Sequence, residues 1–361
     1  MSRRAFVLGG SGQIGQAVAK NLIDSGWLVT IAHRGLHPLP RDLLECGATS
    51  VKLDRRSPGA LARALGPGAD ALIDVIGFDD RDARQLLALQ NDVGAFVVVS
   101  SSSVYRDAEG RTLDEAEENG FPRLPEPIPE TQTTVAPGPK TYSTRKVALE
   151  RALLHGAIVP TTILRPAAIH GVGSAHPREW WFVKRILDGR AAIPIAYRGE
   201  SRFHSCAAAN IAEATRVALE APGTRVLNIA DPSALSIAEI GAVIARHMGF
   251  GGQIIGLDGE EFPARIGRTP WSVLHPFVLD LGAVAALGYS PVTSYAESVG
   301  SVCDGLMETA ANRNWREAFP QLAGYPHDQF DYAAEDAFLS ALTPAGARSL
   351  WPSPRHPRRG R

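Results

Sequence analysis

A glycine-rich segment near the start of the chain constrains the fold more than any other feature. Three glycines at three-residue spacing follow the apolar run Ala5–Leu8: Gly9, Gly12 and Gly15. The next segment, Gln13–Ser25, carries apolar residues at helical spacing. A glycine turn between a buried strand and an amphipathic helix is typical of the first βαβ unit of a nucleotide-binding α/β fold. We therefore expect a parallel α/β domain.

Strand-like and helix-like segments alternate through the first half of the chain. The expected strands are Ala5–Leu8, Leu28–Ala32, Ser50–Leu53, Ala71–Val75, Ala95–Val99 and Thr161–Leu164. The expected helices are Gln13–Ser25, Pro58–Leu65, Asp80–Gln90 and Thr141–Leu154. This alternation predicts a Rossmann-type, doubly wound parallel sheet with ligands at the carboxyl ends of its strands.

The rest of the chain predicts a second, smaller part. The alternation loosens after about residue 170, with helices expected at Glu179–Leu187, Asn210–Leu219, Ser236–His247 and Ser294–Leu306, and strands at Val226–Ile229 and Gln253–Leu257. We expect a dinucleotide-binding domain over residues 1–170 with contributions from later segments, a mixed α/β substrate lobe over 171–343, and a disordered tail rich in proline and arginine over 344–361. Residues 106–139, rich in proline and acids, should form a long surface loop.

The composition argues against several classes of protein. The 361 residues carry 37 basic and 38 acidic side chains, and the net charge of −1 does not favour a nucleic-acid partner. No apolar stretch has the length of a membrane span. Three scattered cysteines and ten histidines without ligand spacing predict neither disulfides nor a metal site. We expect a cytoplasmic protein with a small-molecule substrate; the sequence leaves the oligomeric state open, with a homodimer as one option.

The glycine segment predicts a dinucleotide site. A tight turn, a residue without a side chain and a helix N-terminus together accommodate a pyrophosphate. The expected contacts come from Gly9, Ser11, Gly12, Gln13, Ile14 and Gly15. The second strand is followed by Arg34 rather than by an acid, and a guanidinium suits the 2′-phosphate of NADP. We therefore favour NADP, with NAD as the alternative cofactor.

A tyrosine and a lysine four residues apart provide the candidate chemistry. Tyr142 and Lys146 should lie on one face of a helix. A nearby ammonium favours phenolate and would lower the pKa of Tyr142 from its ordinary value near 10. Such a tyrosine can exchange a proton with a hydroxyl or carbonyl group while a hydride moves to or from nicotinamide. A hydroxyl of Ser100–Ser103, which follow the fifth strand, can hold the substrate oxygen.

Taken together, these motifs resemble the extended branch of the short-chain dehydrogenase/reductase superfamily, the NAD(P)-dependent epimerase/dehydratase family. The match extends to a divergent subgroup related to chloroplast stem-loop-binding proteins, and it runs from Arg4 to about Leu306. The resemblance implies a catalytic Ser-Tyr-Lys set: Ser101, Tyr142 and Lys146. It also implies that Asp54 contacts the adenine amine and that Gly77 lies beside the nicotinamide-side ribose.

The same resemblance suggests where a substrate would bind. The expected substrate contacts are Ser102, Trp181, Arg202 and His204. Pro166 is followed by two alanines, where nucleotide-sugar members usually have an asparagine, which argues against a nucleotide-sugar substrate. We expect an oxidoreductase, epimerase or dehydratase that acts on a small hydroxyl or carbonyl compound. The alternative is a non-catalytic dinucleotide-sensing or RNA-binding relative of the same fold.

Overall fold

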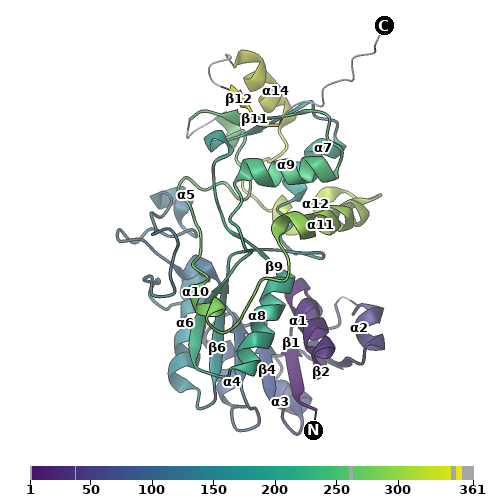
Figure 1. Cartoon of the computed structure of the whole chain (residues 1–361), viewed down its shortest axis with the longest axis vertical. Coiled ribbons are helices and arrows are strands. Elements are labelled where there is room, and N and C mark those ends of the chain that lie inside the picture. The colour runs from purple at the N-terminus through teal and green to yellow at the C-terminus, as the bar shows by residue number, and fades with distance from the viewer. Residues whose placement is uncertain (1, 37, 260–262, 343–346, 352–361) are drawn as a thin grey trace. The chain divides into compact units, whose positions relative to one another are not determined.

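The computed structural model describes residues 2–36, 38–259, 263–342 and 347–351 (Figure 1). The chain divides into two compact units. The first comprises the chain up to Ile169 together with Ser205–Pro232 and Val278–Ser294. The second comprises His170–His204, Ser233–Phe277 and the described chain from Tyr295 onward. Each unit is therefore built from segments that are separated in the sequence.

The first unit contains a seven-stranded parallel sheet in the order β10-β6-β5-β4-β1-β2-β3. Its strands are β1 (Arg4–Leu8), β2 (Leu28–His33), β3 (Thr49–Lys52), β4 (Ala71–Asp74), β5 (Phe96–Val99), β6 (Thr161–Pro166) and β10 (Arg225–Ile229). Every residue of β4, β5 and β6 is buried, as expected for parallel strands covered on both faces. The order reverses between β1 and β4, which confirms the doubly wound Rossmann-type fold.

Helices of the first unit connect the strands. They are α1 (Gln13–Asp24), α2 (Arg41–Glu45), α3 (Ala60–Leu65), α4 (Asp80–Leu87), α5 (Ala116–Asn119), α6 (Tyr142–Gly156), α8 (Ala208–Glu220) and α10 (Gly282–Ala285). A 3₁₀ turn, η1 (Ser102–Val104), follows β5. A small two-stranded sheet pairs β7 (Ala168–His170) with β9 (Ser205–Ala207).

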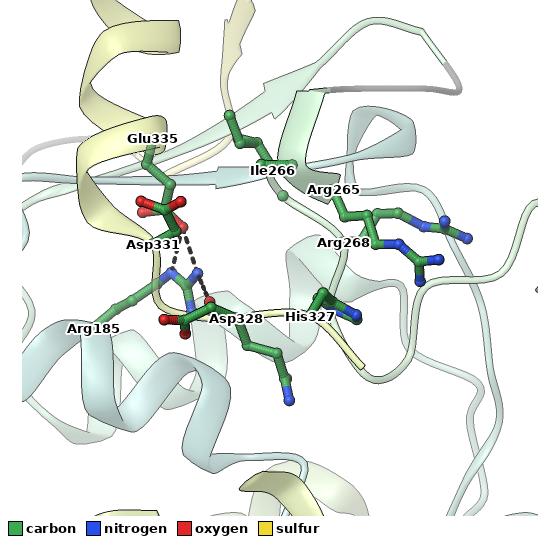
Figure 2. A pocket seen from close by; sticks show the side chains of 11 residues that line it. Arg185, Arg265, Ile266, Arg268, His327, Asp328, Asp331 and Glu335 are labelled. Atoms are coloured by element: carbon green, nitrogen blue, oxygen red, sulfur yellow. Dashed lines mark hydrogen bonds and ion pairs between the residues drawn. The ribbon is translucent and has the colours of Figure 1, made fainter. Parts of the chain in front are cut away.

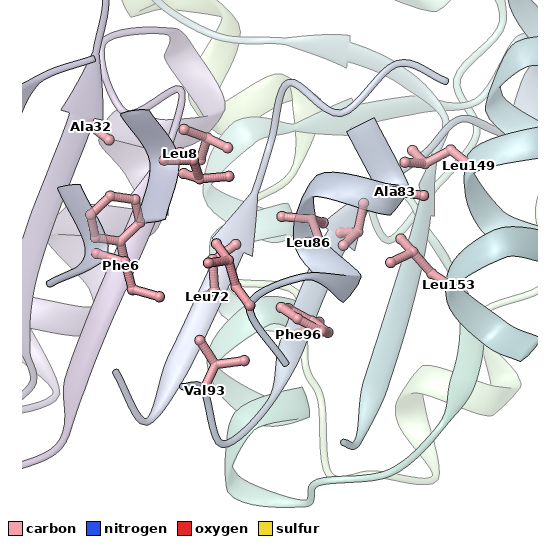
Figure 3. Packing of buried hydrophobic residues seen from close by; sticks show 14 of the residues in the cluster. Phe6, Leu8, Ala32, Leu72, Ala83, Leu86, Val93, Phe96, Leu149 and Leu153 are labelled. Atoms are coloured by element: carbon pink, nitrogen blue, oxygen red, sulfur yellow. The ribbon is translucent and has the colours of Figure 1, made fainter. Parts of the chain in front are cut away.

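One hydrophobic cluster of the first unit lies between the sheet and the helices α3, α4 and α6. Figure 3 shows Leu72 of β4 and Phe96 of β5 packed with Leu86 of α4 and Leu153 of α6. Burial of each such side chain contributes roughly 1.5–3 kcal/mol. Helices α1 and α8 pack against each other outside this cluster (Figure 1).

Local signals explain where these helices begin. The Asp79 side chain accepts hydrogen bonds from the first N–H groups of α4. Thr141 and Thr144 form a capping box at the start of α6. Helix α3 begins at Ala60, not at Pro58 as the sequence suggests, because Gly59 adopts a left-handed φ of 68° that ends the preceding turn.

The second unit mixes helices with a three-stranded sheet in the order β12-β11-β8. Its elements are α7 (Trp180–Leu187), β8 (Ala192–Ile195), α9 (Ile237–His247), β11 (Gln253–Leu257), α11 (Tyr295–Ala310), α12 (Trp315–Ala318), α13 (Pro320–Ala323), α14 (Tyr332–Ala341) and β12 (Ala347–Ser349). The prediction of a disordered tail over 344–361 is wrong where β12 pairs with β11. Residues 344–346 and 352–361 lie outside the described residues.

Candidate functional site

The glycines in the loop after β1 differ in whether the fold itself has room for a side chain at their positions. Gly9 has a left-handed φ of 92°, and its N–H donates to the Ala32 carbonyl at 2.9 Å. A Cβ on Gly15 would lie 2.5 Å from the Cα of Gly10, so the fold demands glycine there. A Cβ on Gly12 would meet nothing closer than 3.7 Å. Gly12 therefore leaves space that the fold itself does not use.

The start of α1 has the chemistry of an anion site. Gly12 is the N-cap residue, supplies no side-chain cap, and is followed by no acid in the first turn of the helix. The first N–H groups and the positive end of the helix dipole therefore face the loop without a competing side chain. Together with the space above Gly12, these features fit a dinucleotide pyrophosphate.

Basic side chains follow β2 and β3. Arg34 is exposed and makes no hydrogen bond or ion pair with the other residues that the structure describes. A Cβ on the adjacent Gly35 would lie 3.0 Å from Lys52 Cε, so the stem of Lys52 packs at this turn. Asp54 is also exposed, and its Oδ1 accepts a hydrogen bond from the Arg56 N–H at 2.9 Å. This end of the sheet presents cations where the sequence predicts the adenosine side of a dinucleotide.

A buried ion-pair cluster shapes the turn that contains Gly77. Arg55 Nη1 lies 2.8 Å from Asp74 Oδ2, and Arg55 Nε lies 3.4 Å from Asp82 Oδ1. The two carboxylates accept the backbone N–H groups of the residues before and after Gly77. A Cβ on Gly77 would come within 3.0 Å of Asp74 Oδ2. This role of Arg55 and Asp82 is not predictable from the sequence, because their partners are distant in the chain.

Lys146 lies at the carboxyl ends of β4 and β5. Its ammonium donates hydrogen bonds to the carbonyls of Gly77 at 2.6 Å and Val99 at 3.0 Å. Burial lowers the pKa of Lys146 to about 8, although the carboxylates of Asp74 and Glu150 act in the opposite direction. The structure thus holds a nearly buried cation at the position where the expected nicotinamide end of a dinucleotide would lie.

Tyr142 is the first residue of α6 and remains 44% exposed. Lys146 Nζ lies 5.7 Å from the centre of its ring, so the predicted shared face is confirmed. The pKa of Tyr142 is raised, chiefly because its surroundings desolvate the phenolate and also because of the charge of Asp114; a hydrogen bond with Ser101 acts in the opposite direction. The lowered pKa predicted from the sequence is therefore wrong for this structure, because desolvation of the phenolate is the largest influence on it.

The serines after β5 do not all have the same environment. Ser101 caps η1, and its hydroxyl donates to Ser103 Oγ at 3.0 Å. Ser103 Oγ lies 2.9 Å from Ser143 Oγ on α6. Ser102, an expected substrate contact, is only 3% exposed. The structure therefore brings Ser101, Tyr142 and Lys146 together, whereas Ser102 points into the protein.

A buried polar network supports this arrangement and was not identified from the sequence. Arg165 donates to both carboxylate oxygens of Glu150, at 3.1 and 2.5 Å, and to the Tyr105 hydroxyl at 3.2 Å. The Tyr105 hydroxyl donates to Asn228 Oδ1, and Asn228 Nδ2 donates to the Ile128 carbonyl. Through Tyr105, which follows η1, the network joins β6, β10 and α6 to the long loop over 106–139, which is largely irregular, as predicted.

The expected substrate contacts of the second unit differ in accessibility. Trp181 is 1% exposed, and its ring stacks 3.6 Å from the Arg185 guanidinium carbon, so it is a core residue. His204 is 3% exposed, and its backbone N–H donates to the Phe277 carbonyl. Arg202 lines a pocket of about 510 Å³ in this unit. Among these three residues, Arg202 is the one that lines this pocket.

A second pocket in this unit has no room for an organic ligand. Figure 2 shows Arg185 with dashed contacts to the Glu335 carboxylate and to the Gln329 carbonyl. Arg265 and Arg268 lie beside each other on another side of the pocket. The enclosed volume is about 10 Å³, the space of one water molecule. This pocket is therefore a packing feature that anchors α14 to α7.

The described residues contain neither a metal-binding cluster nor a membrane-spanning helix. No group of three or more His, Cys, Asp or Glu side chains there is arranged to hold a metal ion. Among the described helices, none combines the length and the apolar character needed to cross a membrane.

Comparisons with known proteins bear on the first unit above all. Residues 9–170 match the family model described as NAD(P)H-binding. A 2′-dehydrokanamycin reductase from Streptomyces kanamyceticus is 30% identical over 175 residues, 47% of this chain and 44% of that protein. Chloroplast stem-loop binding protein of 41 kDa b from Arabidopsis thaliana is 24% identical over 208 residues, 55% of this chain and 50% of that protein. The chain spans about half the length of the curated relatives it matches.

Solved structures share the fold over most of the chain. MoeE5 in complex with UDP-glucose and NAD aligns with a TM-score of 0.61 and 21% identity, covering 85% of this chain and 99% of that chain. UDP-N-acetylglucosamine 4-epimerase from Methanobrevibacter ruminantium M1 aligns with a TM-score of 0.65 and 18% identity, with the same coverage. At these identities the likeness establishes the fold alone.

Proposed function

We propose that the chain is an NADP-using oxidoreductase of the NAD(P)-dependent epimerase/dehydratase type, in which Tyr142 moves the proton. The observation that carries this proposal is the cluster of Ser101, Tyr142 and Lys146 where β4, β5 and α6 meet.

The cofactor would be held along the carboxyl ends of the strands. The proposed contacts are Gly9, Ser11, Gly12, Gln13, Ile14, Gly15, Arg34, Asp54, Gly77, Tyr142 and Lys146. The space over Gly12 and the uncapped start of α1 support the pyrophosphate position. The exposed guanidinium of Arg34 supports NADP over NAD. When bound, the nicotinamide ring supplies or accepts the hydride.

The protein's own residues handle the proton and the substrate oxygen. Because its pKa is raised, Tyr142 is a phenol at neutral pH and can donate its proton to a carbonyl oxygen. Ser101 hydrogen-bonds to Tyr142 and can hold the same oxygen. Lys146 places positive charge beneath the phenol and limits the energy needed to form phenolate after the proton has left. In the opposite direction Tyr142 receives the proton of a hydroxyl group.

The substrate that we propose is a small carbonyl or hydroxyl compound. The relative from Streptomyces kanamyceticus is named as a 2′-dehydrokanamycin reductase, and this name supports the reduction of a carbonyl group. Two alanines, Ala167 and Ala168, follow Pro166, and both are buried without a polar side chain to offer a nucleotide sugar. Small carbonyl compounds and the corresponding alcohols are therefore the class to screen first.

Binding and turnover test separate parts of this proposal. Titration with NADPH and NADH, followed by their fluorescence, should show saturable binding with NADPH tighter. Tyr142→Phe should keep this binding and lower turnover by about 10²–10⁴-fold, the usual contribution of general acid–base catalysis.

A matched pair of serine variants sharpens the test. Ser101→Ala should lower turnover with little change in NADPH affinity. Ser103→Ala, which removes a neighbouring hydroxyl without a bond to Tyr142, should have a mild effect. Full activity of Tyr142→Phe on any substrate would contradict the catalytic assignment, and failure to bind either dinucleotide would contradict the whole proposal.

A further inference from the structure

We propose that Arg55, in the segment between β3 and α3, is a positioning residue that holds the Gly77 carbonyl where it binds the Lys146 ammonium. This inference rests on the proposed function, because Lys146 belongs to the proposed site. The proposed function itself assigns no role to the buried ion-pair cluster around Arg55. The contacts of that cluster connect it to the ammonium in three steps, each with a measured distance.

The two carbonyls that bind Lys146 are fixed in different ways. The Val99 carbonyl, 3.0 Å from Nζ, belongs to the last residue of β5, which lies between β4 and β6 in the sheet. The Gly77 carbonyl, 2.6 Å from Nζ, lies three residues beyond the end of β4. The sheet therefore fixes the first carbonyl but not the second. The turn over residues 76–78 needs another support.

Two buried carboxylates supply that support. Asp74 Oδ1 accepts the Ile76 N–H at 3.0 Å, and Asp82 Oδ2 accepts the Phe78 N–H at 2.8 Å. The backbone is thus bound on both sides of Gly77. A Cβ on Gly77 would lie 3.0 Å from Asp74 Oδ2, so the turn lies directly against that carboxylate. The position of the Gly77 carbonyl therefore depends on where the two carboxylates are held.

Arg55 is the cation that bridges these two carboxylates. Its Nη1 lies 2.8 Å from Asp74 Oδ2, and its Nε lies 3.4 Å from Asp82 Oδ1. Gln85 orients Arg55, because its Oε1 accepts from Nε at 3.0 Å and its Nε2 donates to the Arg55 carbonyl at 2.9 Å. Arg55 is 7% exposed, and both carboxylates are at most 1% exposed. A guanidinium offers its donors in a rigid plane, whereas an ammonium is a point charge on a flexible stem.

Stability alone is a poor explanation for this cluster. Burying charges costs free energy that their mutual attraction returns only in part, and apolar side chains of similar volume often stabilise a protein as well or better. A buried, hydrogen-bonded ion cluster does restrict geometry, because each hydrogen bond tolerates a narrow range of distances and angles. Here the restricted segment is the one that presents a carbonyl to Lys146.

The surroundings of the ammonium give this arrangement a measurable consequence. The titratable and charged groups near it are Asp74 of β4, Asp82 of α4, Glu150 and Tyr142 of α6, and Arg55. Burial lowers the pKa of Lys146 to about 8, although the three carboxylates act in the opposite direction. If the Gly77 turn loosens, water reaches the ammonium and this pKa rises toward 10.5.

The first experiment needs no substrate. Urea unfolding from pH 8 to 10.5 is compared with and without Lys146→Met, first in the wild type and then in Arg55→Lys. The difference within each pair isolates the pH-dependent stability that comes from Lys146, whatever else titrates. Arg55→Lys keeps the positive charge but loses the planar fork. We expect the Lys146 contribution across this window to fall to about half of its wild-type size or less.

Two further variants sharpen the comparison. Arg56→Lys is the matched control, because the Arg56 side chain is 47% exposed and only approaches Asp82 Oδ1 at 3.6 Å. It should leave the Lys146 contribution unchanged. Gln85→Ala keeps every charge and removes the two hydrogen bonds that orient Arg55. It should reduce the Lys146 contribution by a smaller amount, and it provides the test even if Arg55→Lys does not fold.

A purely structural Arg55 would give a different result. Its variants would lose the same stability at every pH, and the Lys146 contribution would keep its wild-type size in both Arg55→Lys and Gln85→Ala. That result would overturn the inference, whether or not Tyr142 proves catalytic.

Turnover links the inference to the proposed function. On a substrate found by the screen, and at a temperature where the variants are folded, Arg55→Lys should lower kcat by roughly 10- to 100-fold because the ammonium is misplaced. Arg56→Lys should leave kcat unchanged. A reduced Lys146 contribution together with a wild-type kcat would support the positioning role of Arg55 and count against the role of Lys146 in the proposed function.

Discussion

At the level of single residues, the proposed preference for NADP over NAD depends on Arg34. Its guanidinium is exposed and has no partner among the described side chains, so it is available to a 2′-phosphate. Arg34→Ala should weaken NADPH binding by roughly 1.5–3 kcal/mol, about tenfold or more, and leave NADH nearly unchanged. Calorimetric titration with both cofactors measures this directly. Equal losses for the two cofactors would make Arg34 a structural residue and remove the NADP assignment.

Lys146 makes a testable contribution to stability as well as to the site. The pKa of its ammonium is about 8 in the folded protein and 10.5 ordinarily. Between these values the unfolded chain binds more protons than the folded one, so stability rises with pH in that window. Across this window, the deprotonation of Lys146 should raise the free energy of unfolding by up to about 3 kcal/mol.

Urea unfolding of the wild type and of Lys146→Met isolates this contribution. Below pH 8 both the folded and unfolded forms of Lys146 are charged, so the difference between the two proteins should be constant. From pH 8 to 10.5 the wild type should gain stability relative to the variant. Two curves that stay parallel through this window would mean that Lys146 is not desolvated in the folded protein.

At the level of elements, the glycine loop provides a matched pair of substitutions. A methyl group at Gly15 would collide with Gly10 and with the Gly9 carbonyl, so Gly15→Ala should destabilise the protein by about 1–3 kcal/mol. Gly12→Ala has room in the fold and an ordinary φ of −87°, so its melting temperature should hardly change. The same methyl group would occupy the space proposed for the pyrophosphate. Gly12→Ala should therefore abolish NADPH binding, and normal binding would place the dinucleotide elsewhere.

Most elements were predictable because their periodicity is local. The strands from β1 to β6 and the helices α1, α4 and α6 lie within a few residues of the expected ranges. The short segments β8 and β12 were not expected, because three or four residues carry too little periodicity to be recognised. Their pairing with β11 is what makes them strands.

At the level of the whole molecule, the charge distribution argues against the alternative that the protein binds RNA. The net charge is −1, and residues 106–139 are acidic. Binding to RNA through phosphates would weaken steeply between about 50 and about 200 mM salt. A chain that ends at Trp351, after β12, should show no such binding in a filter assay. Tight, salt-sensitive binding by that chain would promote the RNA-binding alternative over the enzyme.

The sequence by itself determined the Rossmann-type sheet, the glycine loop and the Tyr142–Lys146 pair, because each depends on spacing within one or two neighbouring elements. Tertiary structure alone decided which residues support them. Asp114, in a loop, accepts a hydrogen bond from the start of α6, and Arg55 pairs with Asp74 and Asp82. The partners in these contacts are far apart in the sequence, so residue spacing could not predict them. Tertiary structure also decided the direction of the Tyr142 pKa, because desolvation depends on everything packed around the phenol, whereas spacing reports only that Lys146 is near.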